Sequence, residues 1–109
     1  MEIDNISIED GNLCIHLNWL LFEDSEKGIF VGIIPTLNIA AKSDQVQKLA
    51  DELNGMVKHF FEYYSDEKLE RELLRKGWNN FSPPEDINVP ILFLYSKTDV
   101  KEIDMKIMI

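Results

Sequence analysis

Apolar and polar side chains alternate along the first third of the chain. From Leu13 to Trp19 every second residue is a large apolar one, which is typical of a β-strand with one buried face. The predicted strand covers 12–23. A polar loop ending in Gly28 follows, and the segment 29–34 is apolar again. This pattern predicts an antiparallel hairpin with glycine at the left-handed position of its turn. The buried face comprises Leu13, Ile15, Leu17 and Trp19, and the opposite face Cys14, His16 and Asn18.

A proline and a further alternating segment extend the sheet beyond this hairpin. Pro35 has no amide hydrogen for a strand ladder, so it marks a bend or an edge. The segment 37–41 alternates again and predicts a third short strand. Gly32, inside the second strand, marks either a bulge or a place where another element approaches closely.

The period changes to three or four residues over 44–64, which predicts an amphipathic helix that Ser43 or Asp44 caps. A helix of this length spans about 30 Å, enough to cross a sheet of three or four strands. We therefore expect its apolar stripe to pack on one face of the sheet. The stripe consists of Val46, Leu49, Ala50, Leu53, Val57, Phe60, Phe61 and Tyr64.

The C-terminal half predicts a shorter helix and further strands. The segment 67–76 is helical, Gly77 ends it, and Trp78 folds back against its leucines. A polar loop spans 79–88, and 89–96 is apolar enough for a fourth strand. The segment 100–109 is either a fifth strand or a poorly ordered tail.

These elements predict one α+β domain over residues 1–109. The expected architecture is an antiparallel sheet of about four strands in the order β-β-β-α-α-β, covered on one face by the long helix.

Composition narrows the class of protein. The chain is 45% hydrophobic and 28% charged, as in soluble globular proteins. Its apolar runs are much shorter than the roughly 20 residues of a membrane span. The acidic N-terminus lacks an apolar signal region, and a lone cysteine, Cys14, fits a reducing compartment. We therefore expect a cytoplasmic protein without membrane association.

Charge points to a kind of partner. Residues 1–30 hold seven acidic residues and one basic residue, which accounts for −6 of the net charge of −9. An acidic surface repels phosphate backbones, so we expect no direct binding of nucleic acid. It suits a basic protein partner. The expected contact residues are the acids around the hairpin turn and a tyrosine off the helical stripe: Glu23, Asp24, Glu26 and Tyr63.

No residue pattern predicts catalysis, a cofactor or a metal. Cys14 and His16 share one strand face, but two ligands do not complete a zinc site. Nucleophilic catalysis needs a nucleophile, a base and a third group that orients the base, and the sequence offers no specific third group for Cys14 and His16. We expect Cys14 to be a small buried thiol and His16 a surface imidazole.

The order of these motifs resembles the HicB-like antitoxin family over about residues 13–78. The resemblance rests on the acidic turn with glycine, the strand that ends in Pro35, the sequence Leu37-Asn38-Ile39-Ala40-Ala41, the capped helix over 44–64, and the leucines that precede Gly77-Trp78. The resemblance implies a partial ribonuclease H-like fold, a β-β-β-α-β unit without the catalytic acids. It also implies a partner, a small basic RNA-cleaving toxin of the HicA type. The C-terminal DNA-binding module usual in that family has no counterpart in 79–109.

Three hypotheses follow. The first is a non-catalytic module that masks a basic ribonuclease toxin. The second is a stand-alone oligomeric adaptor or regulator on the same fold, without a toxin. The third is an enzyme with degenerate ribonuclease H chemistry, which needs several converging carboxylates and a divalent metal. Only Glu23, at the end of the first predicted strand, supplies an acid for it. The small core and an exposed strand edge also predict a homo-oligomer.

Overall fold

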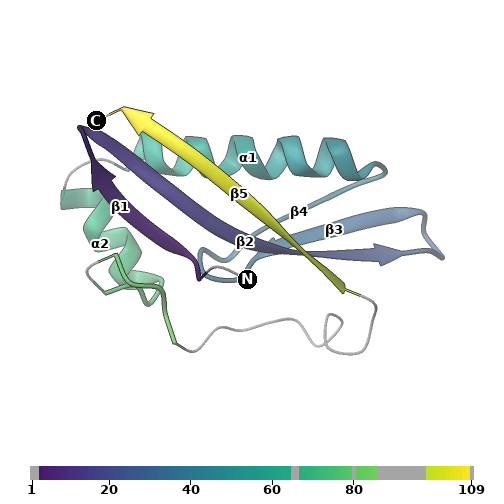
Figure 1. Ribbon diagram of the computed structural model, residues 1–109. Helices are drawn as coiled ribbons and strands as arrows, with labels where there is room; N and C mark the ends of the chain where they lie inside the picture. The colour runs from purple at the N-terminus through teal and green to yellow at the C-terminus, as the bar shows by residue number, and fades with distance from the viewer. Residues whose placement is uncertain (1–2, 65–66, 80, 86–97, 109) are drawn as a thin grey trace.

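The computed structural model describes residues 3–64, 67–79, 81–85 and 98–108. Within them, a five-stranded antiparallel sheet carries helix α1 on one face, and the shorter α2 follows α1 (Figure 1). This confirms the α+β class and the antiparallel sheet covered by a helix. The elements are β1 Asn5–Glu9, β2 Asn12–Asp24, β3 Ile29–Ile34, β4 Ile39–Ser43, α1 Val46–Tyr63, α2 Glu67–Arg75 and β5 Thr98–Met108.

Strand β2 is the centre of the sheet. One of its edges pairs with β5 from Asn12 to Phe22, almost the whole length of the strand. Two strands share the other edge, because β1 pairs only as far as His16 and β3 starts at Leu20. The β2 residues 17–19 therefore lie between the ends of β1 and β3, and no described strand pairs with them on that side.

Strand β1 is an element that the sequence analysis did not predict. It forms a hairpin with β2 through Asp10 and Gly11, whose φ angles are +50° and +75°. Two consecutive residues with positive φ are the geometry of a tight two-residue turn, which suits Asp-Gly. The predicted number of about four strands is therefore too low, because β1 adds a fifth. The predicted strand at 89–96 lies outside the described residues.

The strand alternative for the C-terminal segment is confirmed. Strand β5 runs antiparallel to β2 along its whole length, with Asp104 opposite His16. The alternation of β5 fits this pairing, because Ile103 is 3% exposed on the face that bears the core, whereas Glu102, Asp104 and Lys106 lie on the other face. The β5 residues on the face opposite Ile103 are Val100, Glu102, Asp104, Lys106 and Met108.

The core lies between α1 and one face of the sheet. The predicted alternation of β2 is confirmed, since Leu13, Ile15, Leu17 and Trp19 are all buried in this cluster. Gly32 marks a close approach, because a Cβ there would lie 2.8 Å from Cδ1 of Leu53 and 3.0 Å from the Trp19 ring. The α1 residues that are buried here are Leu49, Leu53, Val57 and Phe61.

The predicted N-cap of α1 is wrong. The helix starts at Val46, with Gln45 in the cap position and no capping bond from its side chain. Ser43 cannot take that place because it is still paired with Phe30 in the β3–β4 ladder. Its Oγ instead accepts a long hydrogen bond, 3.4 Å, from the amide of Gln45.

Helix α2 is held to the sheet by the residues that follow it. Gly77 has a φ of +92°, and the Trp78 amide donates to the carbonyl of Leu73, so Trp78 folds back over the helix as predicted. The indole Nε1 of Trp78 donates to the Thr36 carbonyl at 2.8 Å. Among the described helices, neither is long and apolar enough to cross a membrane.

Candidate functional site

The three acids predicted as partner contacts lie together at the end of the β2–β3 hairpin, two in the last residues of β2 and one in the turn. Glu23 and Glu26 are exposed, and Asp24 is half-buried. The Oδ1 of Asp24 accepts the amide hydrogen of Lys27 at 3.3 Å, which shapes the loop before Gly28 reverses the chain with a φ of +65°. We call residues 23–28 the acidic tip. It projects from the end of the long β2–β3 hairpin (Figure 1).

Neighbouring elements add two further acids to this end of the sheet. Asp99 of β5 is paired with Leu21, two residues before the tip. Asp44 follows the end of β4 and is 3.9 Å from the ammonium of Lys48. Both acids are exposed. The sheet topology thus brings together acids from three separate stretches of the chain.

Tyr63 does not lie with the acidic tip. Helix α1 begins beside the tip and runs to the opposite end of the sheet, a length of about 27 Å for 18 residues (Figure 1). Tyr63, in the last turn of α1, is 68% exposed. It lines a cleft of about 350 Å³ between α1 and α2, where basic side chains predominate. The lining residues are Tyr63, Tyr64, Lys68, Arg71, Glu72 and Arg75.

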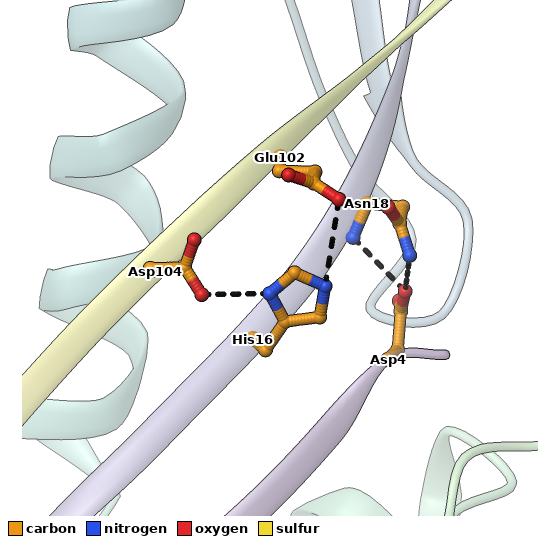
Figure 2. A network of polar contacts seen from close by, with 5 residues as sticks. All are labelled: Asp4, His16, Asn18, Glu102 and Asp104. Carbon is orange, nitrogen blue, oxygen red and sulfur yellow. Dashed lines mark hydrogen bonds and ion pairs between the residues drawn. The ribbon is translucent and has the colours of Figure 1, made fainter. Parts of the chain in front are cut away.

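The opposite face of the sheet from α1 carries a polar network that the sequence did not predict (Figure 2). Its first part is centred on the carboxylate of Asp4, which is only 7% exposed. The Oδ1 of Asp4 accepts from the backbone amide and the side-chain amide of Asn18, at 2.9 Å and 2.6 Å. Its Oδ2 accepts the hydroxyl of Thr36 at 2.7 Å. These bonds join the start of β1, the middle of β2 and the β3–β4 turn, which is a structural role.

The second part of the network is a polar contact across β2 and β5. The Nδ1 of His16 donates to Oδ1 of Asp104 at 2.7 Å, and its Nε2 is 4.0 Å from Oε1 of Glu102 (Figure 2). His16 is 7% exposed, so the expectation of a surface imidazole is wrong. The imidazole is buried on β2, and its two ring nitrogens face the carboxylates of Asp104 and Glu102 on β5.

Cys14 and His16 do not act as a pair. The Sγ of Cys14 donates to Oε2 of Glu9 at 3.7 Å, whereas His16 contacts β5. The Cys14 side chain was expected to be buried and is half-buried. Both residues line a hollow of about 280 Å³ together with Asp104 and Lys106. Across the described part of the chain, no three histidine, cysteine, aspartate or glutamate side chains are grouped closely enough to hold a metal ion.

Comparison with known proteins gives no assignment: no family model matches the chain, and no curated protein and no solved structure matches it. The resemblance to HicB-like antitoxins therefore stays a prediction.

One feature of this site has a signal in the sequence, and another has none. Asp4 precedes Asn5-Ile6-Ser7-Ile8, a short alternating stretch that ends before Asp10-Gly11. That combination is a strong indication of a hairpin, and it would have placed Asp4 against β2. The contact between His16 and Asp104 had no local signal, because 88 residues separate the two.

Proposed function

We propose that this chain is a non-catalytic protein-binding module that masks a small basic ribonuclease toxin, in the manner of a HicB-like antitoxin. The observation that carries the proposal is the acidic tip. Glu23 and Glu26 are exposed at the hairpin end, and the exposed Asp44 and Asp99 add negative charge at the same end of the sheet. Such a surface attracts a basic protein and speeds the encounter, whereas an RNA backbone is repelled.

The order of the elements supports the same proposal. The series β2-β3-β4-α1-β5 follows the β-β-β-α-β order that the resemblance implies, with α2 inserted before β5 and β1 added at the start. In this proposal the sheet and α1 are a scaffold, and Asp4, a buried carboxylate with three donors, stabilises that scaffold and takes no part in chemistry.

The experiment mixes the purified protein with the product of an adjacent gene, provided that the gene encodes a small basic protein. We expect a complex on size-exclusion chromatography at low salt, and loss of the RNA cleavage by that basic protein when the complex forms. The complex should weaken as salt rises, because exposed charges on the tip are screened. A neighbouring protein that cleaves RNA equally well in the presence of this chain would contradict the function.

A charge-reversal variant tests the acidic tip itself. Glu23→Lys combined with Glu26→Lys should weaken the complex at least about tenfold, which is about 1.4 kcal/mol. The matched control, Glu52→Lys combined with Glu85→Lys, makes the same change of net charge at two other exposed positions. Equal weakening by both variants would mean that only net charge matters, and the tip would not be the contact.

The second candidate function is a stand-alone oligomeric adaptor without a toxin partner. The long outer edge of β5 favours it, because no other described strand pairs with this edge, and an unpaired strand edge accepts a strand from another chain. A gene neighbourhood without a small basic protein, together with self-association of the chain, would favour this function over the first.

A further inference from the structure

We propose that the outer edge of β5 pairs antiparallel with β5 of a second copy of this chain, about a two-fold axis at Met105. The two sheets then join into one. The inference rests on the geometry of β5 and is independent of the proposed toxin partner.

Strand β5 offers the longest edge of the sheet. It spans 11 residues, and among the described strands only β2 pairs with it. The other two outer strands, β1 and β4, have 5 residues each. Alternate amides and carbonyls of an edge strand point away from the sheet and can bond to another strand. A second β5 is a partner of matching length, and with a two-fold axis at Met105 the segment 102–108 of each copy is paired.

The residue sequence of β5 selects one pairing. In an antiparallel pair around a two-fold axis, opposite residues lie on the same face, so the axis passes through a residue. With the axis at Met105, each Asp104 lies opposite the partner copy's Lys106, and each Ile103 lies opposite Ile107. The pairing thus gives two opposite-charge contacts and two apolar contacts, the kinds of cross-strand pair that stabilise a sheet.

Neighbouring registers are less favourable. An axis at Ile103 places Glu102 against Asp104 on both sides, and an axis at Asp104 places this carboxylate against its own copy. An axis at Lys106 does the same with two ammonium groups. Like charges directly opposite one another destabilise a strand pair. Only the axis at Met105, among these, gives attraction without repulsion.

Both faces of the sheet are compatible with this pairing. On the α1 side, Ile103 is buried, and Met105 and Ile107 are partly buried against the core, so a second copy would cover apolar surface. On the other side, Asp104 is 74% exposed even though its Oδ1 accepts from His16. Its remaining lone pairs are sufficient for the partner copy's Lys106.

The main test mixes two charge variants. In a dimer of Asp104→Lys, positions 104 and 106 of both copies are all lysine. In a dimer of Lys106→Asp, the same four positions are all aspartate. Each variant alone should self-associate at least about tenfold more weakly than the unmodified chain. Mixed together, they place lysine opposite aspartate at all four positions, so they should associate with each other. Sedimentation equilibrium over about a hundredfold range of concentration measures this.

Glu102→Lys is the matched control, because Glu102 lies opposite Met108 in this register. It should self-associate like the unmodified chain, whose dimer has twice the mass of the 12.7 kDa chain. Loss of the dimer in Glu102→Lys would instead indicate the axis at Asp104, where Glu102 faces Lys106. An unmodified chain that stays monomeric throughout, or variants that fail to associate when both are folded by circular dichroism, overturns the proposal.

A cysteine pair gives an independent measurement that leaves the His16–Asp104 contact intact. In a Cys14→Ser background, Met105→Cys places two thiols opposite each other at the axis, where strand spacing suits a disulfide. Mild oxidation should give a covalent dimer. Glu102→Cys should give none, because its copies are about 20 Å apart along the strands. A dimer from Glu102→Cys and none from Met105→Cys would contradict the register.

Discussion

The carboxylate of Asp4 replaces a missing strand for the backbone amide of Asn18, with Oδ1 2.9 Å from the amide nitrogen. On this edge of β2, pairing with β1 ends at His16 and pairing with β3 begins at Leu20. The Asn18 amide lies in the interval between these two paired segments of β2. A buried amide without an acceptor is costly. Asp4 accepts it and, through Thr36, connects the interval to the β3–β4 turn.

Replacement of Asp4 should therefore destabilise the whole domain. In Asp4→Ala, the amide of Asn18 and the hydroxyl of Thr36 lose their acceptor in a buried site, and we expect a loss of about 2–3 kcal/mol in the free energy of unfolding. Asp99→Ala removes an exposed acid and should change stability by less than about 0.5 kcal/mol. Urea denaturation followed by circular dichroism measures both. Equal stabilities for the two variants would show that water satisfies these donors.

Two glycine-to-alanine substitutions should act in opposite directions. Gly32→Ala forces a methyl group to within 2.8 Å of Leu53 and 3.0 Å of the Trp19 ring, so we expect a loss of about 1–3 kcal/mol. Gly55→Ala has open space around the new Cβ within α1, and should gain up to about 1 kcal/mol from helix propensity. Thermal unfolding of the two variants, each compared with the unmodified chain, tests the sign of each effect. A stable Gly32→Ala variant would mean that α1 shifts away from the sheet at little cost.

The sequence was sufficient where structure depends on local periodicity. The alternation from Leu13 to Trp19 correctly predicts which face of β2 is buried, and the three-to-four spacing in α1 gives its buried stripe. Gly28 and Gly77 both have the positive φ that their positions predicted. In each case the controlling contacts lie within a few residues of each other, or on one face of one element.

The sequence was insufficient where structure depends on pairing between distant segments. Nothing near His16 indicates that β5 will place Asp104 beside it, because that contact is set by a register extending over all of β2. The role of Asp4 likewise exists only because two strands share one edge. The acids of the tip were predictable as a group, but the separation of Tyr63 from them required the direction of α1 (Figure 1).

Cys14 should react with a small alkylating reagent while the protein is folded. Its thiol is half-buried and borders a hollow of about 280 Å³ on the outer face of the sheet. We expect complete labelling, by mass spectrometry, at a rate within about a hundredfold of that in denaturant, because access does not require global opening. A native rate that falls to the rate of global unfolding would contradict access through this hollow.

Trp78 should anchor α2 to the sheet through its indole hydrogen bond as well as through its packing. The side chain is 1% exposed, and Nε1 donates to the Thr36 carbonyl at 2.8 Å. Trp78→Phe keeps an aromatic ring in the buried cluster that includes Leu69 and Leu73 but leaves that carbonyl without this donor. We expect a loss of about 2–4 kcal/mol in the free energy of unfolding, because the hydrogen bond is lost and the smaller ring leaves a void.

The control is Trp19→Phe, whose ring packs in the core under α1. If α2 is held as described, hydrogen exchange in 67–75 should accelerate more in Trp78→Phe than in Trp19→Phe at equal global stability. Equal exchange in the two variants would mean that α2 does not depend on this anchor.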